Sequence, residues 1–141
     1  MPLSGDDVSI RILLVDDHRV YRQQLRVLLD QASGLLVVAE AGDGQAALRQ
    51  AHDHAPDIVL MDVSMPVMNG LEATRRMVTA LPSIRVLALS MHTDTPFVEG
   101  MMDAGARGYA LKDSEVAELV RAIRLVAAGG TYLSPELDGQ G

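Results

Sequence analysis

An apolar run that ends in an acid constrains the fold of this chain more than any other feature. Residues 58–61 read Ile-Val-Leu-Met, and Asp62 follows them, ahead of a loop that closes with Asn69 and Gly70. A strand can be apolar on both faces only where helices cover both sides of its sheet, so the run predicts a central, parallel strand. Asp62 would then lie at the ligand-binding edge of an open α/β sheet. The alternative is that Asp62 only caps the helix that follows.

The composition indicates one domain and limits the kinds of partner. With 141 residues, the chain is long enough to bury about two-thirds of the surface that its unfolded state exposes. Hydrophobic residues make up 48% of the chain and aromatic residues only 3%, so the core must consist of aliphatic side chains and methionines. A net charge of -7 disfavours generic attraction to nucleic acid or anionic lipid, which leaves proteins or a cation as partners.

Two absences from the sequence bear on its location. The chain has no cysteine, which excludes disulfides, thiol catalysis and thiolate metal sites and fits a reducing compartment. No apolar run approaches the roughly 20 residues that span a bilayer, and residues 1–9 lack the features of a secretory signal. We therefore expect a cytoplasmic chain without membrane contact, whose residues 1–9 form a flexible tail.

Strand and helix patterns alternate along the rest of the chain. Strands are expected at 10–15, 35–39, 58–61, 86–89 and 109–111, and each is followed by apolar residues at helical spacing. In the first helix, Leu25, Leu28 and Leu29 are among the residues expected to face the core. This strict alternation with short connections predicts a flavodoxin-like (βα)5 three-layer sandwich, with a parallel five-stranded sheet of order 2-1-3-4-5.

Three acids follow the first and third strands of this predicted sheet. These strands are neighbours in the expected order, so Asp16, Asp17 and Asp62 would converge at one edge. Carboxylates so close together raise one another's pKa unless a cation compensates. Oxygen ligands without cysteine favour Mg²⁺, which binds one or two carboxylates together with phosphate oxygens.

A hydroxyl and an ammonium follow the last two strands. Ser90 ends the fourth strand and Lys112 the fifth, so both are expected near Asp62, where they would orient and balance a phosphoryl group. Taken singly, Ser90 is more simply a helix cap and Lys112 a solvated charge. Their joint position at successive strand ends favours the phosphoryl interpretation.

Five short segments stand out in order along residues 10–135. They are L-L-V-D-D-H at 13–18, D-I-V-L-M-D-V-S-M-P-x-M-N-G at 57–70, L-S-M-H at 89–92, G-A-R-G-Y-A-L-K-D at 105–113 and G-G-x-Y-L-S-P at 129–135. Together they resemble the receiver domains of two-component response regulators, and more narrowly the NarL/FixJ (LuxR-type) subfamily. Any one of these segments would be a weak match, whereas all five with α/β spacing are a strong one.

The resemblance implies a role for each acid at the sheet edge. Asp62 would be the phosphoacceptor, which takes a phosphoryl group from a sensor histidine kinase. Mg²⁺ would be held by Asp17, Asp62 and the backbone carbonyl of Ser64, while Asp16 would hold a metal-bound water. In this family the reaction is the domain's own phosphotransfer and dephosphorylation, so we do not expect an enzyme acting on other substrates.

The same resemblance implies the switch and the domain limits. Ser90 and Tyr109 would be the switch pair, and Lys112 the lysine typical of the family. Residues 10–130 would form the receiver domain. Residues 131–141 would begin a linker to a helix-turn-helix module that is expected to lie outside this chain, so DNA binding is expected only through that module. A homodimer is compatible with the sequence, which does not decide the oligomeric state.

Some residues depart from the family's pattern. Arg19 and Gln24 replace the Pro and Gly usual in the first helix, which changes the surface that a partner kinase would touch. Asp113 stands where many receivers outside this subfamily have Pro. A cis bond before a non-proline residue costs about 2.5–4 kcal/mol, and the sequence leaves open which isomer the Lys112–Asp113 bond adopts.

The four histidines invite a metal or phosphohistidine interpretation. His52 and His54 are two residues apart, so they point to different faces of a helix and make a poor joint site. His18 and His92 lie beside the predicted acidic site and would tune the access of water to it.

Two other functions compete with a phosphoacceptor receiver. An aspartyl-phosphate phosphohydrolase uses a similar acid cluster and lysine, but such an enzyme needs a general acid, and Ser64 stands where a second acid would follow Asp62. A pseudo-receiver that only docks partners would not need the complete set of acids and lysine. The sequence therefore favours a receiver that is phosphorylated on Asp62 and then remodels the surface of its fourth helix, fifth strand and fifth helix to control transcription.

Overall fold

The computed structural model describes residues 9–65 and 68–140. Apart from Ser9, the expected tail lies outside this part of the chain, as do Pro66 and Val67 of the loop after the central strand and Gly141. The elements in chain order are β1 (Ile10–Val15), α1 (Arg19–Asp30), β2 (Leu35–Ala41), α2 (Gly44–His54), β3 (Ile58–Asp62), α3 (Gly70–Ala80), β4 (Arg85–Ser90), α4 (Thr95–Ala104), β5 (Gly108–Leu111), α5 (Val116–Ala127), β6 (Tyr132–Leu133) and the 3₁₀ helix η2 (Pro135–Gln140).

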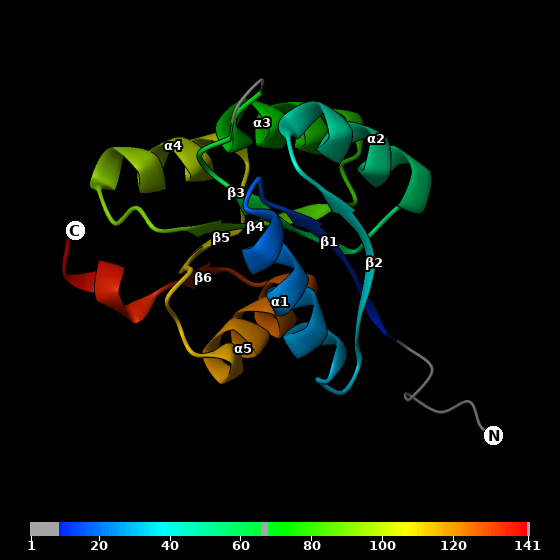
Figure 1. Ribbon diagram of the computed structural model, residues 1–141. Coiled ribbons are helices and arrows are strands. Elements are labelled where there is room, and N and C mark those ends of the chain that lie inside the picture. The colour runs from blue at the N-terminus through cyan, green and yellow to red at the C-terminus, as the bar shows by residue number, and fades with distance from the viewer. Residues whose placement is uncertain (1–8, 66–67, 141) are drawn as a thin grey trace.

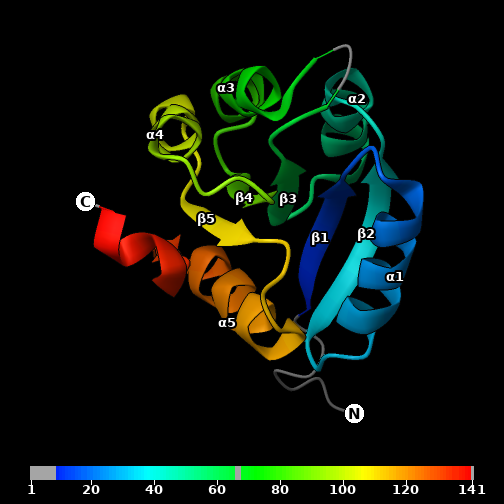
Figure 2. The same cartoon turned by 60° about the vertical axis from the view of Figure 1, so that its left-hand side comes forward.

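A parallel sheet lies between two layers of helices. α2, α3 and α4 cover one face, and α1 and α5 cover the other, as Figures 1 and 2 show from two directions. The strand order is β2-β1-β3-β4-β5-β6, and every neighbouring pair is parallel. The predicted flavodoxin-like fold is therefore confirmed, and the sheet has one strand more than expected.

The central position of β3 explains its composition. All five of its residues are buried, because it pairs with β1 on one side and β4 on the other, with helices above and below. Alternate residues of the strand enter two separate hydrophobic clusters: Val59 and Met61 pack toward α2 and α3, whereas Ile58 and Leu60 pack toward α1 and α5. The apolar run at 58–61 thus fills both halves of the core, as the sequence predicts.

The loop after β3 folds back tightly on the end of that strand. The backbone N–H of Gly70 donates to the carbonyl of Val63 at 2.9 Å. A Cβ atom at position 70 would lie 1.9 Å from the carbonyl oxygen of Asp62, so only glycine fits there. α3 then begins with Asn69 as its N-cap, whose Oδ1 accepts from the N–H of Glu72 at 3.0 Å. The alternative that Asp62 only caps this helix is wrong, because Asn69 does so.

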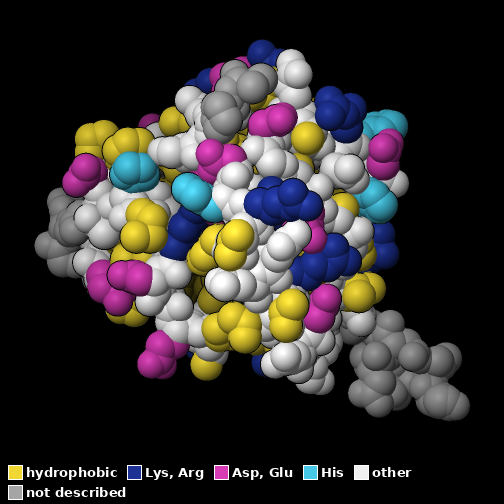
Figure 3. Space-filling view, viewed as in Figure 1, with side chains coloured by type: hydrophobic (Ala, Val, Ile, Leu, Met, Phe, Trp, Pro, Cys, Tyr) yellow, Lys and Arg dark blue, Asp and Glu magenta, His cyan; other side chains and the backbone are white. Residues whose placement is uncertain are grey.

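One predicted core position on α1 faces outward. Leu25 and Leu29 are buried as expected, but Leu28 is 42% exposed. It lies beside Val27, and Val20 of the same helix is also exposed. Figure 3 shows hydrophobic side chains reaching the surface over α1. Successive helical residues are about 100° apart, so Leu28 and Leu29 cannot both face a narrow core stripe, and Leu29 takes the inner position.

The segment after α5 packs on the edge of the sheet. Tyr132 and Leu133 of β6 pair with Gly108 and Tyr109 of β5, and Tyr132 is buried. Leu137 of η2 is also buried, in the cluster shared with α3 and α4. A two-residue strand is too short to show a hydrophobic period, so the sequence pattern could not reveal it.

Within residues 9–65 and 68–140, no helix combines the length and apolar character needed to cross a membrane.

The packing of η2 predicts a measurable contribution to stability. Leu137 is 4% exposed, whereas Leu133 in the adjacent strand is 39% exposed. Leu137→Ala should lower the free energy of unfolding by about 2–4 kcal/mol, because it leaves a cavity in the core. Leu133→Ala is the matched control and should cost less than about 1 kcal/mol. Urea denaturation followed by circular dichroism measures both, and equal losses would contradict the observed packing.

Candidate functional site

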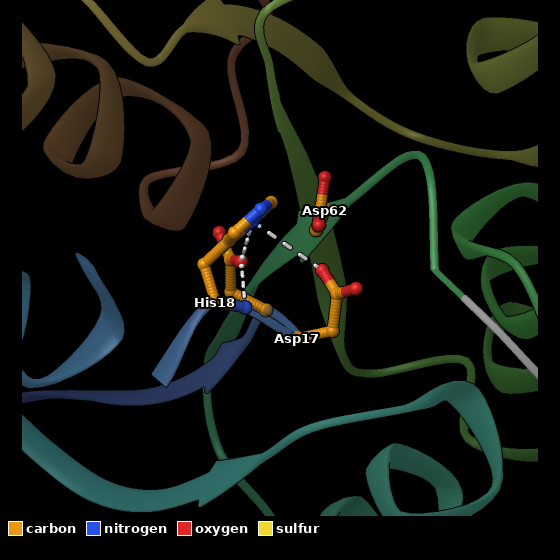
Figure 4. A group of neighbouring side chains, drawn as sticks. Asp17, His18 and Asp62 are labelled. Atoms are coloured by element: carbon orange, nitrogen blue, oxygen red, sulfur yellow. Dashed lines mark hydrogen bonds and ion pairs between the residues drawn. The ribbon is translucent and has the colours of Figure 1, made fainter. Parts of the chain in front are cut away.

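The acids after β1 and β3 meet at one edge of the sheet. Val15 pairs with Met61, so the next residues, Asp16 and Asp62, leave neighbouring strands side by side. Both of these aspartates are buried, and Asp17 beside them is exposed. Figure 4 shows Asp17 next to His18, with Asp62 across from them at the end of β3. The structure therefore brings together the three acids that the sequence predicts at this edge.

The four side chains of this edge lie close enough to share one ion. Asp16, Asp17, His18 and Asp62 each offer a ligand atom, and these atoms all lie within 4.8 Å of one another. The N–H of His18 donates to Asp16 Oδ1 at 2.8 Å and so fixes that carboxylate. The His18 ring is mostly exposed, with Nδ1 at 3.3 Å from Asp16 Oδ1 and 3.5 Å from Asp17 Oδ1. The ring thus covers the acids from the solvent side.

Lys112 supplies the positive charge of the site. Its Nζ lies 2.6 Å from Asp16 Oδ2 and 3.5 Å from Asp62 Oδ1, and its side chain is only 8% exposed. The backbone N–H of Lys112 donates to the carbonyl of Ser90 at 2.9 Å, which fixes the end of β5 against β4. The peptide bond between Lys112 and Asp113 is trans. A solvated surface charge is therefore the wrong interpretation of Lys112.

Tyr21 of α1 is a neighbour of this lysine that no sequence pattern indicated. The Nζ of Lys112 lies 5.0 Å from the centre of the Tyr21 ring, where a cation is attracted to the aromatic face. Burial, followed by the charges of Asp16 and Asp62, raises the pKa of Tyr21 to about 12. The helical spacing of Tyr21 gave no signal for this contact, because it depends on how α1 packs against the end of β5.

One ammonium does not compensate the acids fully. Burial, and then the charge of Asp16, raises the pKa of Asp62 to about 6, although Lys112 and the N–H of Ser64 act in the opposite direction. That N–H lies 3.4 Å from Asp62 Oδ1. The other oxygen, Asp62 Oδ2, is buried and has no hydrogen-bond partner among the described residues. The site therefore carries excess negative charge and one unsatisfied carboxylate oxygen.

These features fit a hard divalent cation. The donors are carboxylate oxygens, Asp62 Oδ2 is free to bind, and the exposed Asp17 leaves room for water ligands. Mg²⁺ prefers such a site, since it binds one or two carboxylates and keeps several waters. Ser64 follows Asp62 by two residues at the exposed rim, which suits the expected role of its carbonyl. His52 and His54 lie at the far end of α2 and do not join this group.

Ser90 and Tyr109 lie one strand away and are tied to the same loop. Ser90 is buried, and its Oγ accepts from the N–H of His92 at 2.9 Å. The hydroxyl of Tyr109 donates to the carbonyl of His92 at 2.9 Å. Tyr109 is fully buried, so in this structure its ring points inward. This burial raises the pKa of the Tyr109 hydroxyl.

An open hollow leads from the surface to the acids. It measures about 470 Å³ and is lined by Asp17, Val63, Ser64, Met65, Asn69, Leu71 and Phe97. His92 stands at its rim, where its Nε2 lies 3.0 Å from the Ser64 hydroxyl. The His92 ring also stacks on Phe97 at 4.1 Å between ring centres. The hollow therefore opens beside the acid site, and Asp17 is the acid that lines it.

The chain is similar to characterised regulators over most of its length. Residues 12–124 match the family model described as "Response regulator receiver domain". Response regulator GacA of Pseudomonas viridiflava is 44% identical over 131 residues, and the match covers 93% of this chain and 61% of GacA. Transcriptional regulatory protein DegU of Brevibacillus brevis is 38% identical, with 92% and 55% covered. The chain thus spans about three-fifths of the length of such relatives.

A solved structure gives the same result. The LuxR-family two-component response regulator from Aurantimonas sp. SI85-9A1 superposes with a TM-score of 0.89 at 40% identity, and the match covers 93% of this chain and 94% of that one. The fold, the family match and the acid site at the sheet edge thus agree. The chain belongs to the response regulator receiver domain family, in its NarL/FixJ type, and is the receiver domain of a two-component response regulator.

Proposed function

We propose that this chain takes a phosphoryl group from the phosphohistidine of a sensor histidine kinase onto Asp62, and later loses it to water. One observation supports this most: Asp62 is buried at the end of the central strand with an unpartnered Oδ2, beside Lys112 and two further acids. A carboxylate in this position is held ready for a phosphorus atom that enters through the adjoining hollow.

The chemistry relies on positioning and on neutralisation of charge. A carboxylate oxygen of Asp62 attacks the phosphorus atom while the bond from phosphorus to the donor nitrogen breaks. Asp17, Asp62 and the carbonyl of Ser64 would hold Mg²⁺, with Asp16 binding one of its waters. When bound, Mg²⁺ reduces the repulsion between the carboxylate and the phosphoryl oxygens.

Lys112 acts on the other side of the transferred group. Its Nζ lies between Asp16 and Asp62, so a phosphoryl group on Asp62 comes within reach of the ammonium without movement of the backbone. The competing phosphohydrolase interpretation has less support, since Ser64 offers no carboxylic acid for a leaving group. A pseudo-receiver would have no use for a buried lysine between two buried acids.

The same site can signal to the surface of α4, β5 and α5. Ser90 Oγ accepts a hydrogen bond from the N–H of His92, and its hydroxyl proton can turn toward a phosphoryl oxygen on Asp62. A shift of Ser90 toward that oxygen would pull on the loop that Tyr109 holds through the carbonyl of His92. α4 follows this loop, and its N-cap Asp94 makes no side-chain capping bond, so the start of the helix is weakly held.

We further propose that this change controls transcription through a DNA-binding output domain. The chain spans only part of its relatives, and DegU is described as a transcriptional regulatory protein. With a net charge of -7, residues 1–141 alone are not expected to hold DNA. A cytoplasmic location remains a prediction of the sequence, and a homodimer is compatible with it.

The first prediction concerns the phosphoacceptor. Acetyl phosphate with Mg²⁺ should add one phosphoryl group to the wild-type chain, and EDTA should prevent this. Asp62→Asn should abolish the addition, since the amide is not a nucleophile at this step. Asp53→Asn, at an exposed position on α2, is the matched control and should react like the wild type. Intact-mass spectrometry measures all three, and full phosphorylation of Asp62→Asn would refute the assignment.

The second prediction concerns the cost of holding Asp62 ionised. Its pKa of about 6 in the folded protein exceeds the ordinary 3.8. Protonation of Asp62 therefore stabilises the folded protein. This contribution is fully present below about pH 4 and is lost as the pH rises through 6. In EDTA at pH 7.5, Asp62→Asn should be more stable than the wild type by about 1–3 kcal/mol, with a smaller gain at pH 4.5. Urea denaturation tests this, and a gain that does not depend on pH would contradict it.

The third prediction concerns the switch. Ser90→Ala should still permit phosphorylation of Asp62 but weaken the response at α4, because a hydrogen bond to a charged group is worth roughly 1.5–3 kcal/mol. Amide hydrogen exchange, compared before and after phosphorylation, should change from Ser90 through Leu111 in the wild type and much less in the variant. Changes confined to the loop after Asp62 in the wild type would rule out this switch.

A further inference from the structure

Two arginines of α1 share one glutamate of β2. Arg22 Nε lies 2.7 Å from Glu40 Oε1, and Arg26 Nη1 lies 2.7 Å from Glu40 Oε2. The side chains of Arg22 and Glu40 are only 16% and 19% exposed. Burial alone would raise the pKa of Glu40, but the hydrogen bonds from Arg26 and Arg22 hold it below its usual value. Glu40 is therefore ionised and directs both guanidinium groups.

Of the two arginines, Arg22 is the one bound to the acid site. Its Nη1 donates to the backbone carbonyl of Asp16 at 2.5 Å and lies 3.5 Å from the carbonyl of Ala41. The carbonyl of Ala41 in turn accepts from the N–H of Asp16 at 3.0 Å. Arg26 instead approaches the carbonyl of Val37, at 3.4 Å, and the carboxylate of Asp30, at 3.8 Å. Thus β2 holds the peptide unit before Asp16, and Arg22 of α1 holds the one after it.

Gly42 lies directly beside this arrangement. A Cβ atom there would lie 3.4 Å from Arg22 Nη1, in ordinary van der Waals contact with the guanidinium. Arg22 thus lies between the end of β2 and the turn that carries Asp16 and Asp17. It bridges Glu40 and the Asp16 carbonyl with two different nitrogens, which a lysine could not do with its single ammonium.

We propose that Arg22 is a positioning residue for the Mg²⁺ site, which acts by fixing the main chain at Asp16 and thereby the carboxylates of Asp16 and Asp17. This inference rests on the proposed Mg²⁺-dependent function of Asp62. The physical reason is repulsion: Asp16, Asp17 and Asp62 carry like charges within 4.8 Å, and the exposed turn after β1 is the part free to move away. A charge-assisted hydrogen bond to the carbonyl of Asp16 opposes that movement.

The alternative is that Arg22 only joins α1 to β2. The chain offers a matched control for this, since Arg26 binds the same Glu40 from the same helix but makes no hydrogen bond or ion pair with the acid site among the described residues. Arg22→Gln and Arg26→Gln each remove one positive charge and one ion pair to Glu40. Only Arg22→Gln also removes the bond to the carbonyl of Asp16. A purely structural role predicts similar effects of the two changes on Mg²⁺ binding.

Isothermal titration calorimetry with Mg²⁺ alone, without a phosphodonor, tests the proposal. Arg22→Gln should weaken Mg²⁺ binding roughly tenfold, as loss of a residue that orients metal ligands does elsewhere. Arg26→Gln should stay within about twofold of the wild type, on the view that it touches no ligand. Arg22→Lys keeps the positive charge but loses the bridge between Glu40 and the Asp16 carbonyl. Its Mg²⁺ binding should therefore remain weakened. Urea denaturation of the same proteins reports how far each one is destabilised.

The outcomes separate this inference from the proposed function. If the wild type binds Mg²⁺ and both Gln variants are weakened equally, or neither is, Arg22 is not a positioning residue, while the proposed function stands. Full recovery of binding in Arg22→Lys would show that charge alone matters and would also overturn the inference. If the wild type binds no Mg²⁺, both fail. Should Arg22→Gln not fold, the comparison of Arg22→Lys with Arg26→Lys decides in the same way.

Discussion

Repulsion among the carboxylates of Asp16, Asp17 and Asp62 is the constraint on which the rest of the structure depends. A parallel sheet brings the ends of β1 and β3 together, so these charges lie close to one another unless the turn after β1 moves away. Lys112 compensates only part of the charge, and burial followed by the charge of Asp16 raises the pKa of Asp62. Under the proposed function, a cation and then a phosphoryl group bind at this edge, and each would change its net charge.

Few contacts connect the acid site to the surface of α4. Ser90 and Tyr109 both bind the backbone of His92, whose ring reaches Ser64 on one side and Phe97 of α4 on the other. A change at Asp62 therefore has a short route to α4. On the opposite side of the site, Arg22 connects the turn after β1 to β2. The strands supply rigidity, while the loops at their ends supply the reactive groups and the moving parts.

Much of this could be predicted from sequence because the determinants are local or follow from topology. The apolar run before Asp62 fixed β3 as central, and the alternation of units fixed the order of five strands, which placed Asp16, Asp17 and Asp62 together. What could not be predicted depends on packing. β6 has only two residues, Leu28 competes with Leu29 for one stripe, and the contacts of Arg22 and Tyr21 depend on how α1 docks.

A crystal structure of the chain grown with Mg²⁺ and beryllium fluoride would test the central claim most directly. Beryllium fluoride mimics a phosphoryl group on a carboxylate, so it should be bound to Asp62, in contact with Lys112 and Ser90. The metal should lie among Asp16, Asp17 and Asp62, and the same crystals of Asp62→Asn should contain no beryllium fluoride. A fluoride adduct on another residue, or Mg²⁺ bound away from these three acids, would contradict the assignment of Asp62 as the phosphoacceptor.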